Sequence, residues 1–141
     1  MQRDFEIKDG IYLAQPPHEL DLHNNFDFCG LDYSVEHRTL SLHWRRSTGD
    51  WVAGGTPASV SVEFREVSEF RFLPRDAELP FTEDDCVSDF GYWADEAWAD
   101  GVFLMPDSTK TPDPRWLTGI HFMSGATIAV QASSAHARIA A

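Results

Sequence analysis

The chain has 141 residues, of which 43% are hydrophobic, and its 23 acidic and 11 basic residues give a formal net charge of -12. This length and composition predict one folded domain whose core needs neither a disulfide nor a structural metal. The negative charge argues against nucleic acid and anionic membranes as partners, because both would repel the surface.

The N-terminus and the cysteines bear on compartment. Five of the first ten residues are charged, so no apolar stretch of signal-peptide length is present there. No run approaches the roughly 20 apolar residues that cross a bilayer. Cys29 and Cys86 lack CxxC spacing, which favours two reduced thiols in a cytoplasmic protein over a single disulfide. We therefore expect a cytoplasmic protein without a cofactor.

Alternation of apolar and polar residues dominates the first half of the chain. Residues 10–14 and 26–35 are predicted strands, joined by a loop that begins at Pro16 and continues to Asn25. The clearest alternation spans residues 39–45 and places three apolar side chains on one face. These are Leu40, Leu42 and Trp44. This pattern predicts a half-buried strand.

The same alternation continues downstream. Residues 59–64 and the Phe70–Phe72 stretch are predicted strands, and residues 65–68 between them are a turn or bulge because the phase changes. Residues 116–123 and 126–132 predict a final hairpin, after which the alanine-rich end is expected to fray. Short, evenly spaced strands of this kind predict an all-β, mainly antiparallel fold, either a β-sandwich or a roll.

Residues 76–113 differ from the rest. With eleven acidic residues and one basic residue they carry -10 of the total charge, and they also hold six aromatic residues. A purely solvating acidic tail would be poor in aromatics. We expect this segment to be an ordered excursion from the sheet within a single domain of residues 1–141. Short helical turns are predicted at 82–85 and 95–99, and a loop at 106–114.

Two groups of residues could hold metal ions but lack the required spacing. His18, Asp21 and His23 offer zinc-type donors, yet their spacing matches no rigid ligand pattern. A second group supplies the carboxylates that calcium prefers, without the calcium-loop sequence. It consists of Glu83, Asp84, Asp85 and Asp89. We expect polar surface at both places and no metal site.

Catalytic motifs are also incomplete. Residues 49–56 resemble a phosphate-binding loop, but Gly55 stands where that loop needs a lysine and a strand follows in place of a helix. Neither Ser124 nor either cysteine lies in a nucleophile motif. These observations favour a non-enzymatic protein, although the many carboxylates leave a weak hydrolase open.

The combination of acidic and aromatic residues in 76–113 is the most informative feature for function. Carboxylates attract a basic partner, while Trp and Tyr supply buried contact area. The candidate partner-binding residues are Asp84, Asp85, Asp89, Trp93 and Trp98. We predict a protein-binding module for a basic protein partner.

The Leu40/Leu42/Trp44 strand, the 60–64 strand and the 67–72 stretch together resemble small bacterial β-rich domains, some of which resemble immunity proteins of polymorphic toxin systems. The resemblance covers about residues 20–73 and assigns no functional residue. It implies a cytoplasmic, non-enzymatic protein that binds and neutralises a toxin.

Two alternatives stay open. One is a small-ligand or carbohydrate binder, or a weak hydrolase, that uses Trp44 or Trp116 with two carboxylates in a cleft of the sandwich. The other is self-association into a homo-oligomer through an edge strand.

Overall fold

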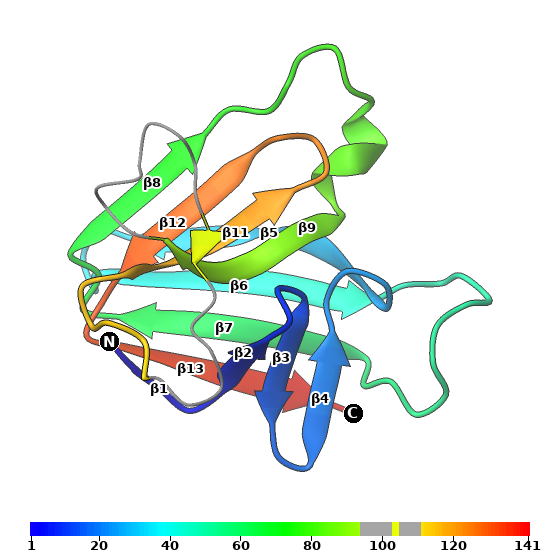
Figure 1. Ribbon diagram of the computed structural model, residues 1–141, viewed down its shortest axis with the longest axis horizontal. Helices are drawn as coiled ribbons and strands as arrows, with labels where there is room; N and C mark the ends of the chain where they lie inside the picture. Colours follow the sequence, from blue (N-terminus) through cyan, green and yellow to red (C-terminus); the bar gives the residue numbers. More distant parts are fainter. Residues whose placement is uncertain (94–102, 105–110) are drawn as a thin grey trace.

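The computed structural model describes residues 1–93, 103–104 and 111–141. These residues form two five-stranded sheets and one three-stranded sheet (Figure 1). All strand pairs in the described part are antiparallel except the short pair β1–β13. The predicted fold class, an all-β and mainly antiparallel sandwich, is confirmed. No helix among these residues is long and apolar enough to cross a membrane.

The first sheet has the strand order β1-β13-β7-β6-β5. Its strands are β1 (Gln2–Arg3), β13 (Ser134–Ala140), β7 (Ser59–Arg65), β6 (Thr39–Arg46) and β5 (Phe26–Ser34). The alternation seen in the sequence is the reason for its shape, because one face of β6 and β7 is apolar and the other polar. The predicted strands 26–35, 39–45 and 59–64 are therefore confirmed.

The second sheet has the order β10-β9-β11-β12-β8. Its strands are β10 (Phe103–Leu104), β9 (Val87–Trp93), β11 (Leu117–Phe122), β12 (Thr127–Gln131) and β8 (Glu69–Leu73). The predicted hairpin of β11 and β12 is confirmed, and Gly125 in its turn has a φ of 85°, which glycine adopts without strain.

The core lies between these two sheets. Leu40, Leu42 and Trp44 of β6 are buried, and so are Phe90 of β9 and Ile128 of β12, in one continuous cluster. Strand alternation delivers these side chains to one interior layer, and their burial is the main stabilising contribution to the sandwich.

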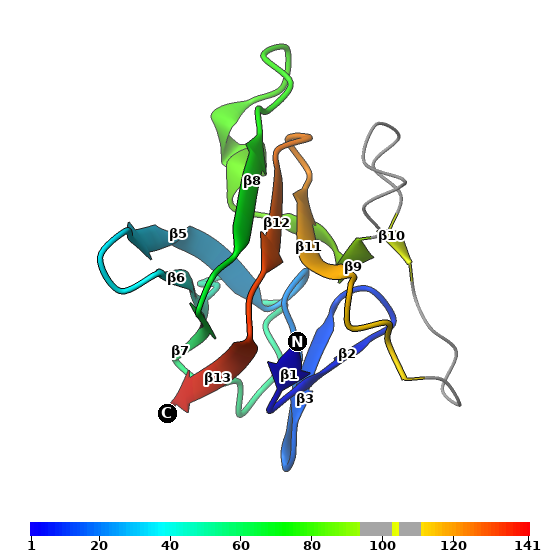
Figure 2. The ribbon, with the colours of Figure 1, turned by 90° about the vertical axis from the view of Figure 1, so that its left-hand side faces the viewer.

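The N-terminal strands form the third sheet, ordered β2-β3-β4. They are β2 (Glu6–Lys8), β3 (Tyr12–Gln15) and β4 (His18–Asp21), with a cis peptide bond between Pro16 and Pro17 in the turn before β4. Leu13 and Leu20 reach the core cluster, and Phe5 stacks on Phe90 at 6.3 Å. This sheet therefore covers one side of the sandwich, below β9 in Figure 2.

Two expectations are corrected by this arrangement, and one of the two predicted helical turns is present. Residues 18–21, predicted as loop, form β4, which pairs with β3 in register Leu13↔Leu20. Residues 87–93, predicted as part of the excursion, form β9 between β10 and β11. The predicted helical turn at 82–85 is present as the 3-10 turn η1 (Phe81–Asp84), whereas the turn predicted at 95–99 lies outside the described residues.

The C-terminal end does not fray. Residues 134–140 form β13, which lies between β7 and β1, with Ala135 and Ala137 buried against the core. Alanine composition suggested a loose tail, but small side chains are what the crowded position beside Phe64 and Val62 accommodates.

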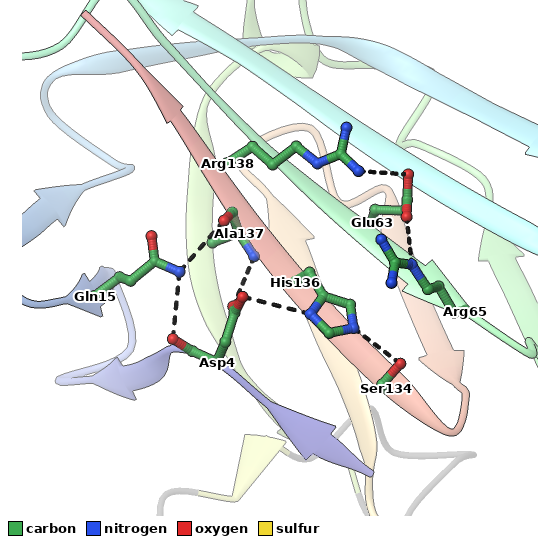
Figure 3. Close-up of polar contacts among 8 residues, drawn as sticks. All are labelled: Asp4, Gln15, Glu63, Arg65, Ser134, His136, Ala137 and Arg138. Atoms are coloured by element: carbon green, nitrogen blue, oxygen red, sulfur yellow. Dashed lines mark hydrogen bonds and ion pairs between the residues drawn. The ribbon is translucent and has the colours of Figure 1, made fainter.

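A polar cluster joins the N-terminal segment to β13 (Figure 3). Asp4 Oδ1 accepts a hydrogen bond from the backbone N–H of Ala137 at 2.8 Å, and Asp4 Oδ2 lies 3.4 Å from His136 Nδ1. Gln15 Nε2 donates to the carbonyl oxygens of Asp4 and Ala137, both at 3.3 Å. Strand β1 pairs with β13 over two residues only. Directly after β1, the Asp4 carboxylate accepts the hydrogen bond from the Ala137 N–H that a backbone carbonyl of a longer strand would accept.

The two sheets end at β5 and at β8 on the side opposite the N-terminal sheet (Figure 2). Tyr33 of β5 contacts Phe70 of β8, with ring centroids 5.5 Å apart. An edge strand presents unpaired backbone groups to solvent. On this side of the described residues, the predicted self-association through an edge strand has β5 and β8 as candidate strands, and it stays a prediction.

Removing the Asp4 acceptor should destabilise the fold. We expect Asp4→Ala to lower the free energy of unfolding by about 1 kcal/mol, because the Ala137 N–H loses its partner at the margin of the sheet. Asp4→Asn keeps an acceptor oxygen at the same place and should cost less. Urea unfolding of the three proteins measures this; equal midpoints for Asp4→Ala and the unchanged chain would contradict it.

Candidate functional site

A pocket of about 420 Å³ opens between the two sheets on the side of β5 and β8. Four phenylalanines line it: Phe28, Phe72, Phe81 and Phe122. The remaining walls come from the β8–β9 connection, with Arg75, Asp84 and Asp85, and from small residues of β5 and of the β11–β12 turn. We call this site the Phe pocket.

A β-bulge in β5 shapes one wall. Phe28 pairs with Trp44 and Gly30 pairs with His43, so Cys29 is the extra residue. Gly30 has a φ of 148°, a backbone conformation that disfavours side chains. The Phe28 N–H donates to the carbonyl oxygen of Asp85 at 2.8 Å, which ties the bulge to the segment before β9. Bulges redirect side chains at sheet edges, and this one places Phe28 and Cys29 on the pocket.

The opposite wall has exposed rings. Phe72 on edge strand β8 is 56% exposed, and Phe81 at the start of η1 is 80% exposed. In the described residues β8 pairs with β12 and with no strand on its other side. Phe28 continues the apolar surface inward, since its ring centroid lies 4.8 Å from the ring centroid of buried Phe122. The pocket therefore runs from solvent to the edge of the core.

Arg75 fixes the β8–β9 connection around the pocket. Its Nε donates to both carboxylate oxygens of Asp84, at 2.8 and 3.1 Å, and its Nη2 donates to the carbonyl oxygen of Leu79 at 2.6 Å. Its guanidinium also lies 4.6 Å from the centroid of the Phe81 ring. One side chain thus holds the carboxylate, the loop backbone and the exposed ring of this wall together.

The two neighbouring carboxylates of the pocket differ electrostatically. Hydrogen bonds from Arg75 and Ser124 lower the pKa of Asp84, whereas partial burial and then the Asp27 carboxylate raise the pKa of Asp85. No ion pair joins Asp85 to a Lys, Arg or His of the described residues. Asp84 is therefore neutralised inside the molecule, and Asp85 is not.

The predicted partner-binding residues do not form one surface. Asp84 and Asp85 line the Phe pocket, but Asp89 lies on the face of β9 that points away from the first sheet, 4.0 Å from His121. Trp93 is 1% exposed and packs with Leu117 and Ala129 in a small cluster separate from the main core, so its ring is not an exposed contact surface. Trp98 lies outside the described residues.

The pocket phenylalanines were missed in the sequence because their alternation resembles that of core residues. Phe72 follows Phe70 at strand spacing, and only the position of β8 at a sheet edge leaves its ring uncovered. Phe81 carried a weak signal, since it lies between Pro80 and four consecutive acidic or hydroxyl residues, a polar setting for a ring.

The candidate metal residues do not converge. Among the described residues no group of three or more His, Cys, Asp or Glu side chains is placed to hold a metal ion. Asp21 instead accepts hydrogen bonds from the backbone N–H groups of His23 and Asn24 and stabilises the turn after β4. Residues 49–56 connect the antiparallel strands β6 and β7, so a strand follows this segment where a phosphate-binding loop would lead into a helix.

Cys86, which lies beside the pocket-lining residue Asp85 but does not itself line the pocket, is a poor nucleophile. Both cysteines are free thiols. Burial raises the pKa of Cys86, and the carboxylates of Asp85 and Glu83 raise it further, which disfavours the thiolate although His23 Nδ1 lies 3.7 Å away. The tryptophans of the carbohydrate alternative are elsewhere: Trp44 is buried in the core, and Trp116 packs against Tyr92 at 6.2 Å.

Comparisons of this chain with family models, with curated proteins and with solved structures give no match. The function must therefore be argued from the Phe pocket and its charges.

Replacing Arg75 should bring the pKa values of the Asp84 and Asp85 carboxyls closer together. In the unchanged chain Asp84 should titrate below and Asp85 above the usual aspartate value. Arg75→Met should raise the pKa of Asp84, because its hydrogen bonds from the guanidinium are lost. Side-chain carboxyl NMR measures both residues. Asp113, whose pKa is held at about 2 by Arg115, is an internal control that should not move.

The same substitution has a consequence for stability. A lowered folded-state pKa means that the Asp84–Arg75 pair stabilises the fold above the unfolded pKa and ceases to do so as the pH falls through the folded pKa. Arg75→Met should therefore lose less stability on acidification below about pH 4 than the unchanged chain. An unchanged Asp84 pKa in the variant would contradict this account.

Proposed function

We propose that this chain is a non-enzymatic, cytoplasmic binding module for a basic protein, and that the Phe pocket is its recognition site. The observation that carries the proposal is the juxtaposition of two exposed phenylalanines with an unpaired carboxylate at one opening: Phe72, Phe81 and Asp85. Exposed apolar surface beside a largely apolar pocket is costly to leave in water and is characteristic of interaction sites.

The two kinds of group serve different steps of binding. Fully covering a phenylalanine ring contributes about 1.5 to 3 kcal/mol, so Phe72 and Phe81 supply residence time. The carboxylates and the net charge of -12 increase the rate of encounter with a positive surface. A toxin neutralised by this protein, as the resemblance to immunity proteins implies, is one partner of this class.

A small-molecule ligand is the second candidate function. The observation that favours it is the pocket volume of about 420 Å³, which lies within the range of pockets that hold small molecules. The same phenylalanines and Asp85 would contact the ligand. A small-molecule ligand would bind to the isolated chain, whereas the first candidate function requires a basic protein. This difference distinguishes the two candidate functions.

Quantitative affinity capture from extracts of the host tests the proposal. Asp85→Lys places a positive charge at the pocket and should reduce capture of a basic partner at least about tenfold, because like charges repel and the carboxylate is lost. Asp89→Lys makes the same change of net charge on the far face of β9 and is the matched control. Its capture should fall by no more than about twofold.

The outcome is decided by comparing the two variants. Selective loss of a basic protein in Asp85→Lys and in Phe81→Ala, with retention in Asp89→Lys, supports the pocket as the recognition site. Equal recovery of the same proteins by all variants would refute it. Thermal unfolding of each variant confirms that a loss of capture is not a loss of folding; Phe81 is exposed enough for substitution to leave the core intact.

A further inference from the structure

Resting on the proposed function, we infer that the Phe pocket receives a Lys or Arg side chain of the partner protein, with Asp85 as the counter-charge and the phenylalanine rings around the aliphatic stem. The inference concerns the chemistry of the inserted group, which the proposed function leaves open. It follows from the charges at the pocket, from the rings that line it, and from the cost of covering Asp85.

The charges at the pocket leave one position for a cation. Arg75 is committed to Asp84 and to the Leu79 carbonyl oxygen. Asp85 lies beside that pair, and the carboxylates of Asp27 and Glu83 add negative potential at it, with Arg45 as the opposing charge. Asp84 forms an ion pair with Arg75, whereas Asp85 forms none among the described residues, and Arg45 acts on it only from a longer distance.

The rings supply the matching environment. Phe28, Phe72 and Phe81 border the same space as Asp85. The pocket already holds one such contact, since the Arg75 guanidinium lies over the Phe81 ring at 4.6 Å. Aromatic faces attract ammonium and guanidinium groups, and the methylene stems of Lys and Arg pack well on apolar surface. A long basic side chain therefore satisfies both the walls and the carboxylate.

The free-energy cost of covering the Asp85 carboxylate favours a cationic over an apolar side chain of the partner. A partner that inserted Leu or Phe would strip water from the Asp85 carboxylate without supplying a hydrogen-bond donor or a positive charge. Burial already raises the pKa of the Asp85 carboxyl, so removing more water from it would destabilise its ionised form further. An inserted Lys or Arg turns the same desolvation into a charge-assisted hydrogen bond.

Small probes that reproduce the side chains test this without knowledge of the partner. Butylammonium has the atoms of the lysine side chain, propylguanidinium has those of arginine, and 1-butanol is a neutral match. Each is titrated into the full 15N-labelled chain at constant ionic strength. Saturable amide shifts at Phe28, Phe72, Phe81 and Asp85 are expected with the cations, with dissociation constants of about 1 to 30 mM for ligands this small.

Three variants make the test specific. Asp85→Asn should weaken cation binding about threefold to tenfold and leave the response to 1-butanol unchanged. Phe72→Leu keeps an apolar wall without an aromatic face and should weaken the cations about twofold to fivefold. Asp89→Asn removes the same charge from the opposite face of β9 and should change neither. A dispersed amide spectrum shows that each variant is folded.

The possible results separate this inference from the proposed function. Equal binding of 1-butanol and the cations, or no loss in Asp85→Asn, would overturn the inserted cation. The absence of saturable amide shifts with both cations would also overturn the inserted cation. In each of these cases the capture experiment still decides whether a basic protein binds at the pocket by other groups. Selective cation binding that depends on Asp85 and Phe72 supports the inference even where capture yields no partner.

Discussion

Face-to-face packing of two alternating sheets is the constraint on which the rest of this structure depends. Alternation along β6 and β7 sends one set of side chains inward, and the opposing strands β9, β11 and β12 do the same. Two stacked sheets have two open sides, where edge strands meet no neighbour. The N-terminal sheet covers one of them. On the other, Tyr33 and Phe70 close the seam at one point and the Phe pocket opens beside it.

The shape and charge of the pocket depend on one cation, Arg75, which pairs with only one of two adjacent aspartates. Arg75 makes contacts with Asp84, the Leu79 carbonyl oxygen and the Phe81 ring, so it positions the wall and neutralises one carboxylate at the same time. Because one guanidinium pairs with one carboxylate, the neighbouring Asp85 keeps an unpaired charge. The difference between two adjacent aspartates is thus a matter of geometry, and the proposed preference of the site for a positive group rests on it.

Sequence patterns predicted the strands with strict alternation and failed where composition and periodicity disagreed. Residues 39–45 and 59–64 were predicted because each carries a full alternating face. Residues 134–140 alternate too, yet their alanines suggested a loose end until β13 was seen packed between β7 and β1. Residues 87–93 were assigned to the excursion because of the acidic residues around them, although β9 itself is largely apolar. Local charge density hid a strand whose burial depends on distant neighbours.

The sequence by itself determined the class of fold and the location of the charge, because both depend on local composition and on the period of two along a strand. It also brought Asp84 and Asp85 to attention. Only the tertiary structure decided which groups act together. Phe28 reaches the pocket through a bulge, and Phe72 is exposed because β8 ends its sheet. Trp93, equally prominent in the sequence, is buried. The physical reason is that pairing with a distant strand, and not the residue type, determines whether a side chain lies in the core or at an open edge.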